Sequence, residues 1–190
     1  MTNSKQARLF DMILGIKEIH RRVQEEKLVE NLSERELKNP EGAGLDLRLG
    51  KVFRLEGKGF LGVEERDTPK SVLVGEYKEG EGNVFILNPG EYVLTETIER
   101  FTMPLDVVGI IKPRTTLHRS GIIARMGAID PGYSGPVHPA LFNAGGVPLT
   151  FELGARYVNV MFLEVKGGVP GYRGQWQGGR VSTDGKEKQV

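Results

Sequence analysis

The stretch GLDLRLG at residues 44–50 alternates three leucines with an aspartate and an arginine, and it ends at a glycine. A period of two puts the leucines on one face and the charges on the other, which is the pattern of a half-buried β-strand. Further short apolar runs follow along the chain, each bounded by Gly or Pro, at residues 71–74, 85–87, 92–97, 107–111, 122–125, 137–143, 149–153 and 157–165. Short strands with frequent turns predict an all-β domain of the barrel or jelly-roll kind.

Helical patterns lie before this strand. Apolar residues in steps of three and four predict one short amphipathic helix from Asp11 to about Glu26; these residues are Ile13, Ile16, Ile19 and Val23. Ser33 with Glu36 three places later fits a capping box, so a helical turn is expected near 33–38. The predicted fold class is therefore mainly β with a short N-terminal helix.

The chain divides into three parts by composition. Residues 1–10 are polar and are expected to form a flexible N-terminus. Residues 11–166 form the β domain, in which residues 56–83 are rich in Gly, Glu and Lys and are expected to be an exposed excursion with one strand. Residues 167–190 are Gly-rich and polar but carry aromatic side chains, which favours an arm that folds over a ligand. The aromatic residues of this arm are Tyr172 and Trp176.

The composition excludes several classes of function. With 190 residues, 26 Lys+Arg and 25 Asp+Glu, the chain suits one domain and lacks the basic excess typical of nonspecific nucleic-acid binding. The absence of cysteine excludes a disulfide framework, a thiolate zinc site and a cysteine nucleophile, and three scattered histidines do not predict a metal site. No apolar run approaches the ~18 residues of a membrane span, and no secretory signal is visible. We therefore expect a cytoplasmic protein without a membrane partner.

Residues 112–121, KPRTTLHRSG, form the densest chemical motif. They place two arginines, a lysine and two adjacent hydroxyls close together after an apolar strand. Guanidinium groups, hydroxyls and backbone N–H groups are the donors that a polyphosphate needs. The alternative interpretation is a solvated helical turn between two strands. The motif is not a P-loop, because no GxxxxGK[ST] pattern occurs in the chain.

Two further stretches could carry chemistry. In GAIDPGYSG, residues 127–135, Asp130 precedes a Pro-Gly turn and is rigidly aimed, so it could take a sugar hydroxyl or hold a water molecule as a general base. The alternative is an Asx-type turn between strands. In GYRGQWQGGR, residues 171–180, arginine, glutamine and aromatic residues among glycines could wrap an anionic, planar ligand. The alternative there is a disordered terminus.

Taken in order, these stretches resemble the motifs of the trimeric dUTPase/dCTP deaminase superfamily. GLDLRLG is similar to the first motif, RTTLHRSG at 114–121 resembles RSSLxRxG, and IDPGYSG at 129–135 resembles IDPGWxG. GARYVN at 154–159 resembles GxRxxQ with Asn for Gln, and WQG at 176–178 fits the YQG of the tail. The resemblance implies a distorted jelly-roll (β-clip) fold, a homotrimer with active sites between subunits, and a C-terminal arm that closes over the nucleotide.

The resemblance also assigns roles to individual residues. It implies that the triphosphate contacts four residues of the second motif, namely Arg114, Thr115, Thr116 and Arg119. Asp130 would hold the deoxyribose 3′-hydroxyl and, with Arg119, act in catalysis, while Tyr133 would lie against the sugar. Tyr172 and Gln177 would reach the substrate from the arm. Magnesium would bridge the phosphates and need few protein ligands.

One departure decides which reaction we expect. Deaminating members of the superfamily carry a catalytic glutamate in the strand after IDPGWxG, and the corresponding position here is Ala140. Alanine cannot take a proton from water or give one to departing ammonia. His138 shares its strand face but lies about 6–7 Å along the strand, so we interpret it as a packed or surface histidine rather than a replacement. We therefore expect a dUTP diphosphatase, which converts dUTP and water to dUMP and diphosphate.

Two alternatives remain open at this stage. The chain could be a dCTP deaminase, including the bifunctional kind that forms dUMP. It could also be a nucleotide-binding regulator that kept the pocket and lost the chemistry. In each case the ligand is a deoxyribonucleoside triphosphate, with dUTP expected and dCTP as the alternative. The sequence does not show the base preference, because backbone groups commonly read the pyrimidine in this superfamily.

Overall fold

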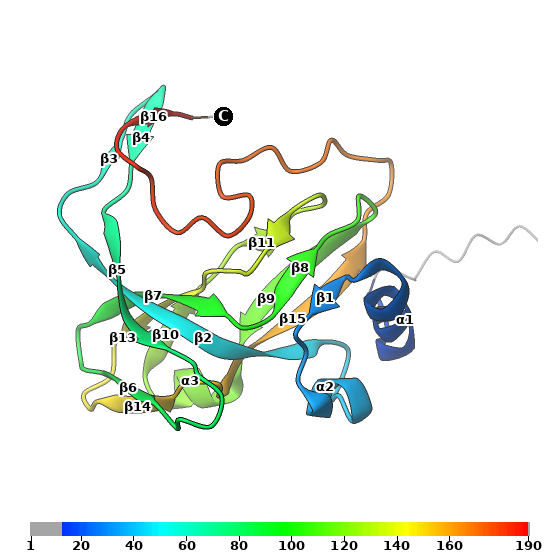
Figure 1. Ribbon diagram of the computed structural model, residues 1–190, viewed down its shortest axis with the longest axis horizontal. Helices are drawn as coiled ribbons and strands as arrows, with labels where there is room; N and C mark the ends of the chain where they lie inside the picture. Colours follow the sequence, from blue (N-terminus) through cyan, green and yellow to red (C-terminus); the bar gives the residue numbers. More distant parts are fainter. Residues whose placement is uncertain (1–12, 190) are drawn as a thin grey trace, which may run out of the picture.

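The computed structural model describes residues 13–189, and the flexible N-terminus predicted over 1–10 lies outside them. Figure 1 shows a curled β-structure with two of its helices on one side, so the predicted all-β class is confirmed. The helices of the described chain are α1 (Ile16–Glu26), α2 (Glu34–Lys38) and α3 (Thr115–Arg119).

One large antiparallel sheet forms the body of the domain, in the order β10-β13-β7-β2-β15-β9-β11, with β5 paired to β2 beside this path. Its strands are β2 (Leu45–Glu56), β5 (Lys70–Glu76), β7 (Tyr92–Thr97), β9 (Val107–Pro113), β10 (Ile122–Arg125), β11 (Ala128–Ile129), β13 (Ala140–Asn143) and β15 (Arg156–Glu164). Because β2 pairs with β15, β7 and β5, it is the strand around which the sheet curls.

Three smaller sheets close the body. The first contains β1 (Val29–Glu30), β8 (Arg100–Thr102) and β12 (Ser134–Gly135); the second pairs β6 (Val84–Leu87) with β14 (Leu149–Glu152). The third contains β3 (Phe60–Leu61), β4 (Glu65–Asp67) and β16 (Glu187–Lys188). The third sheet therefore joins the end of the chain to the excursion at 56–83.

Strand β2 confirms the alternation in GLDLRLG, but its charged face is not exposed as the alternation predicts. Leu45, Leu47 and Leu49 are fully buried, as a half-buried strand predicts. Asp46 is also buried, at 9 % exposure, because neighbouring segments cover the second face of this central strand as well. A buried charge needs a partner, and the charged residues of β2 find theirs in arginine and glutamate side chains from distant segments.

The N-terminal helix begins later than the sequence pattern predicts. Ile13 forms a β-bridge with Leu163, and the backbone N–H of Leu14 donates to Phe162 at 2.8 Å, so this segment is extended before α1 starts at Ile16. The helical turn α2 is confirmed, with the hydroxyl of its N-cap Ser33 accepting from the backbone N–H of Glu36.

The excursion at 56–83 contains three strands where the sequence pattern predicts one. β3 and β4 form a hairpin, and β5 pairs with β2 from Lys51 to Glu56. These strands are largely exposed, so they lack the apolar alternation that marks a buried strand. The predicted strand at 137–143 begins only at Ala140, because Pro139 has no N–H with which to extend the ladder.

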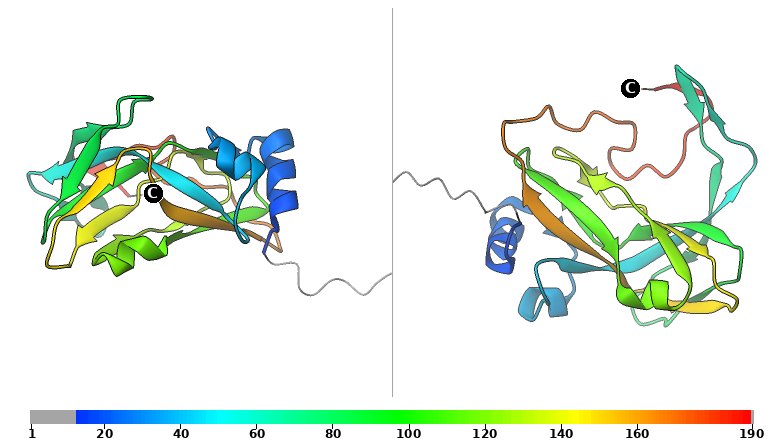
Figure 2. Two further views of the ribbon diagram at one scale, coloured as in Figure 1. Left: turned by 90° about the horizontal axis from the view of Figure 1, so that it is seen from below. Right: turned by 180° about the vertical axis from the view of Figure 1, so that it is seen from behind.

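The C-terminal arm, described over residues 167–189, leaves the end of β15 and crosses over β11 to reach β4, as Figure 1 and the right-hand view of Figure 2 show. It ends in β16, whose pairing with β4 anchors it. No helix in the described part of the chain is both long and apolar enough to cross a membrane.

Candidate active site

A cavity of about 630 Å³ opens between the arm and the large sheet. Its walls come from β5, β7, the turn after β11, the segment that leads into β13, and the arm. The volume lies in the range of sites that enclose small organic ligands. Strands far apart in the sequence thus meet the arm at one concave site.

The turn 129–135 forms one wall of the cavity. The N–H of Tyr133 donates to the carbonyl of Asp130 at 3.1 Å, and the N–H of Gly132 donates to Met103 at 2.9 Å. These bonds fix the turn, so the exposed Asp130 side chain lies at the rim and the Tyr133 ring lies buried in the wall. Burial raises the pKa of Tyr133 to about 12, and its hydroxyl donates to the Pro136 carbonyl.

The arm is fixed to this turn by its own polar groups. The side-chain amide of Gln177 accepts from the N–H of Ser134 at 3.1 Å and donates to the carbonyl of Gly132 at 3.0 Å. The N–H of Tyr172 donates to Pro131 at 2.7 Å, and the Tyr172 ring meets that of Tyr133 edge-on, with centroids 5.5 Å apart. In this structure Gln177 holds the arm, and its predicted contact with substrate stays a prediction.

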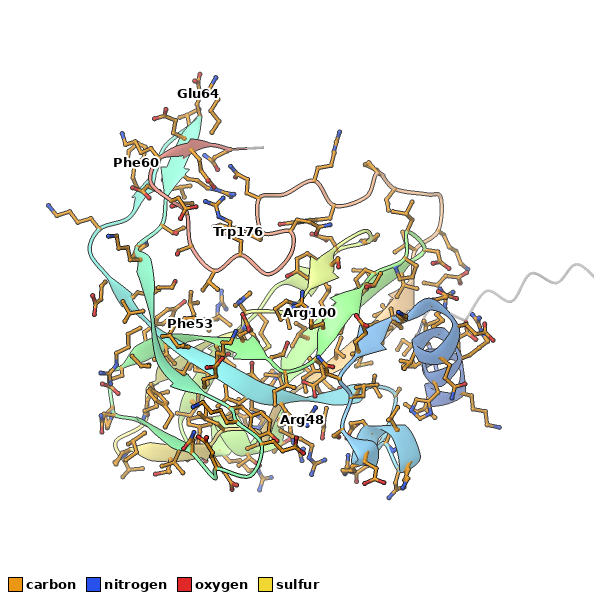
Figure 3. All side chains as sticks on the ribbon, viewed as in Figure 1. Arg48, Phe53, Phe60, Glu64, Arg100 and Trp176 are labelled. Carbon is orange, nitrogen blue, oxygen red and sulfur yellow. The ribbon has the colours of Figure 1, made fainter. Side chains whose placement is uncertain are left out.

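The outer part of the arm is held by the β3–β4 hairpin. Figure 3 labels Trp176 on the arm, and the guanidinium of Arg66 lies 4.4 Å from the centre of its ring. Arg180 pairs with Glu187 at 2.7 Å, and Trp176 and Arg180 both line the cavity. The excursion therefore supports the arm, which is a role that its composition did not predict.

The predicted phosphate-binding residues lie elsewhere. They follow β9, whose other end pairs with β11; about 16 Å of extended strand separates Gly109, the partner of Ile129, from Arg114. Within the described part of the chain, the cavity wall includes none of Arg114, Thr115, Thr116 and Arg119. One copy of the chain therefore brings together Asp130, Tyr133 and Tyr172, and it does not bring the arginines of α3 to them.

Arg114 is part of a charged cluster at the start of β2. Its guanidinium donates to Asp46, which also accepts from Arg156 and from the amide of Asn159, each at 3.0 Å. Three motifs of the sequence thus meet at one buried carboxylate. By contrast, Thr115, Thr116 and Arg119 are exposed on α3.

The sheet below the cavity carries a polar row, Lys51, Glu96 and His138, of which the sequence analysis singled out only His138. Glu96 accepts from Lys51 at 2.9 Å through one oxygen and contacts Nε2 of His138 at 3.1 Å through the other. Burial favours a raised pKa for Glu96, but the hydrogen bonds from His138 and Lys51 outweigh it, so the pKa lies below the usual 4.5. The alternation in 92–97 could have placed Glu96 on the same face as Leu94, which lines the cavity.

Ala140 lies on this same side of the sheet. It pairs directly with Leu94 of β7 and is 5 % exposed. His138, two residues before it, lines the cavity with Leu94. The predicted sharing of a face by residues 138 and 140 therefore agrees with the geometry.

The chain belongs to the dCTP deaminase-like family, whose sequence model matches residues 13–165. It is 32 % identical to a dCTP deaminase of Pyrococcus furiosus over 170 residues, covering 89 % of this chain and 96 % of that protein. It is 36 % identical to a dCTP deaminase of Thermococcus gammatolerans, with 84 % and 89 % covered. It is 34 % identical to a "dCTP deaminase, dUMP-forming" of Dictyoglomus turgidum, with 81 % of each covered.

A solved structure shares the fold. The crystal structure of 2′-deoxycytidine 5′-triphosphate deaminase from Agrobacterium tumefaciens superposes with a TM-score of 0.62 and 18 % identity, covering 80 % of this chain and 49 % of that one. Together with the sequence matches, this makes the chain an enzyme of the dCTP deaminase/dUTPase superfamily with its distorted jelly-roll fold.

The expected dUTP diphosphatase activity is wrong, because the relatives that match across nearly the whole chain are named for deamination of dCTP. The expectation rested on Ala140 alone. It assumed that the group that transfers protons has to stand at that one position of the sheet. The large sheet offers other polar side chains on the same face, so the step from a missing carboxylate to a missing reaction was not justified.

Proposed function

We propose that this protein deaminates dCTP, adding water at C4 of the cytosine and releasing ammonia. The observation that carries the proposal is the similarity to three dCTP deaminases at 32–36 % identity over 81–89 % of the chain. The cavity supports it, because its volume of about 630 Å³ lies within the 300–1,000 Å³ typical of small-ligand sites.

In this proposal the deoxynucleoside lies in the cavity between the turn 129–135 and the arm. Asp130 at the rim accepts a hydrogen bond from the 3′-hydroxyl, and the buried ring of Tyr133 forms the wall beside the deoxyribose. Tyr172 and Gln177 keep the arm over the bound nucleotide, since both already bond to the turn. The closed site would exclude bulk water from the reacting C4.

We further propose that the active protein is a homotrimer whose sites lie between subunits. The phosphate-binding group of Arg114, Thr115, Thr116 and Arg119 is separated from the cavity in one chain, so a second copy would supply it. The exposed side chains of α3 are free to reach a neighbouring cavity. Arg119, predicted to act in catalysis, would then neutralise phosphate charge across the interface.

Magnesium is the cofactor that we propose, carried on the phosphates of the substrate. Among residues 13–189, no three His, Cys, Asp or Glu side chains gather as a metal site. The few protein ligands available there fit an ion whose other ligands are phosphate oxygens and water, as is usual for Mg²⁺. When bound, it would offset the charge of the triphosphate.

The test is to incubate the protein with dCTP and magnesium and to measure ammonia and nucleotide products separately. We expect one ammonia per dCTP consumed, and chromatography shows whether the product is dUTP or dUMP. CTP, which differs only by its 2′-hydroxyl, is the matched control for the wall that Tyr133 forms beside the deoxyribose. Tight binding of dCTP without ammonia would overturn the proposal and leave a nucleotide-binding regulator.

A further inference from the structure

A row of three side chains crosses the sheet and reaches the cavity at one end: Lys51 on β2, Glu96 on β7 and His138 before β13, of which His138 lines the cavity. Lys51 and Glu96 are register partners, and their side chains meet at 2.9 Å. Glu96 and His138 meet at 3.1 Å, and the His138 side chain is 15 % exposed. The row places an imidazole in the cavity wall with a carboxylate directly behind it.

The carboxylate determines which ring nitrogen of His138 is available. Glu96 is ionised at neutral pH, because its pKa lies below the usual value, so its oxygens only accept hydrogen bonds. Nε2 must therefore be the donor, and in the neutral ring the free lone pair is on Nδ1. Within residues 13–189, no hydrogen bond engages Nδ1.

The other titratable groups in the cavity wall are less suited to proton transfer from water. They are Asp130, Tyr92, Tyr133, Tyr172 and Arg180. Tyr133 has its hydroxyl bonded to Pro136, and Tyr172 accepts from the N–H of Trp176. Arg180 stays protonated, and Asp130 is at the exposed rim.

Contrary to the sequence-based interpretation of His138 as a packed or surface histidine, we propose that His138 carries out the proton transfers of dCTP deamination in place of the carboxylate that is absent at Ala140, and that Glu96 is its positioning residue. The inference rests on the proposed function. His138 lies on the same sheet face as Ala140, two residues before it and so about 6–7 Å away, and His138 itself lines the cavity of about 630 Å³.

The proposed step balances as follows. The oxygen of a water molecule bonds to C4 of the cytosine as the C4=N3 double bond opens, Nδ1 of His138 takes one proton of the water, and N3, which receives the electron pair of the opened bond, takes that proton from His138. The C4–N4 bond then breaks, its electron pair leaves with nitrogen, and the leaving group gains a proton to become ammonia. Of the two protons of the water, one ends on ammonia and the other on ring N3 of the uracil, so His138 returns to its neutral state.

The first experiment compares ammonia release by the wild type and His138→Gln. We expect kcat to fall about 100-fold or more, the range of general acid–base catalysis, with little change in KM for dCTP or in melting temperature. His20→Gln is the matched control, since His20 lies on α1 and bonds the backbone of Glu36. The double variant His138→Gln with Ala140→Glu should recover activity, because it returns a carboxylate to the sheet face.

The second experiment tests Glu96 as a residue that acts through His138. We expect Glu96→Gln to lower kcat about tenfold without raising KM. In the His138→Gln background the same change should have no further effect, since residues that act as a unit are not additive. A merely structural role for Glu96 would lower activity equally in both backgrounds.

The outcomes separate this inference from the proposed function. If the wild type releases no ammonia from dCTP, the proposed function fails and the inference falls with it. If the wild type releases ammonia and folded His138→Gln keeps its kcat, only the inference is overturned. Should His138→Gln not fold, Glu96→Gln, Lys51→Gln and the double variant are compared instead. If the losses of kcat in the two single variants add up in the double variant and KM for dCTP rises in parallel, the inference about His138 is overturned.

Discussion

Asp130 shows how a single residue is aimed by its neighbours. The bond from the N–H of Tyr133 to its carbonyl closes the turn, and Pro131 fixes the backbone that follows. The carboxylate is therefore exposed at the cavity rim and makes no contact that the fold depends on. Loss of the Asp130 charge should thus weaken ligand binding far more than it lowers the stability of the fold.

We predict that Asp130→Asn lowers kcat/KM for dCTP about 10- to 100-fold, because one hydrogen bond to a charged group contributes about 1.5–3 kcal/mol. The melting temperature should stay within about 1 °C, since the residue is exposed. Steady-state ammonia release and a thermal melt measure the two effects. An unchanged kcat/KM would remove Asp130 from the site.

Glu96 gives a prediction about stability and pH. Its pKa in the folded protein is lowered, so its ionised form stabilises the fold above the usual value of 4.5, and this contribution is lost as the pH falls through the lower folded value. Glu96→Gln should therefore be less stable than the wild type by about 1 kcal/mol at pH 7. Urea unfolding at pH 7 and at pH 3.5 should show that the difference in free energy of unfolding between wild type and Glu96→Gln becomes smaller in acid. A difference that becomes larger in acid would contradict the lowered pKa of Glu96.

At the scale of elements, the arm and the turn 129–135 fit together through a glycine. Gly132 has φ +81°, and a Cβ there would lie 2.9 Å from Gly171 Cα and from the N of Tyr172. The two backbones touch because no side chain stands between them. The position of the arm therefore depends on this one residue as much as on its own hydrogen bonds.

We predict that Gly132→Ala displaces the arm and raises KM for dCTP at least several-fold, because a Cβ would collide with backbone atoms of the arm and push them away from the turn. Trypsin should then cut more readily after Arg173 and Arg180, which mass spectrometry detects. Gly90→Ala is the matched control, since Gly90 has φ +79° but open space around its Cα. Equal cutting of the arm in both variants would show that backbone strain, not the close contact, is responsible.

At the scale of the whole molecule, the separation of α3 from the cavity predicts complementation between subunits. Arg114→Ala and Asp130→Asn should each be strongly impaired alone, Asp130→Asn by the factor of about 10 to 100 given above. Trimers that contain both variants should regain about one third of the wild-type sites, because only one of their three interfaces pairs an intact Arg114 with an intact Asp130 of another copy. Co-expression with two affinity tags, followed by an ammonia assay on the doubly purified protein, measures this.

Mixed particles that stay as inactive as their parents would contradict the shared site. Gel filtration of each variant is the control for assembly, because Arg114 also bonds to the buried Asp46 and its loss could weaken the domain. If mixed particles of trimer size form and show no recovered activity, the phosphate-binding residues do not act across an interface.

The alternation in GLDLRLG, the capping box at Ser33 and the turn signals around Pro131 allowed most elements to be predicted. These signals depend on residues a few places apart, so the chain displays them before it folds. The late start of α1 was missed because it is fixed by pairing with a distant strand rather than by a local pattern. In the excursion, β4 likewise pairs with the distant β16, and the local β3–β4 hairpin is too exposed to show an apolar alternation.

The site divides in the same way. The sequence alone determined the motifs, their order and therefore the family, since each motif consists of consecutive residues. Only the tertiary structure decided that Glu96 lies against His138, that Arg114 bonds Asp46, and that α3 lies away from the cavity. Contacts of this kind depend on strand register and on how the sheet curls. Both are set by packing among residues as far apart in the chain as Leu45 and Val160, and for that reason Ala140 by itself did not reveal the reaction.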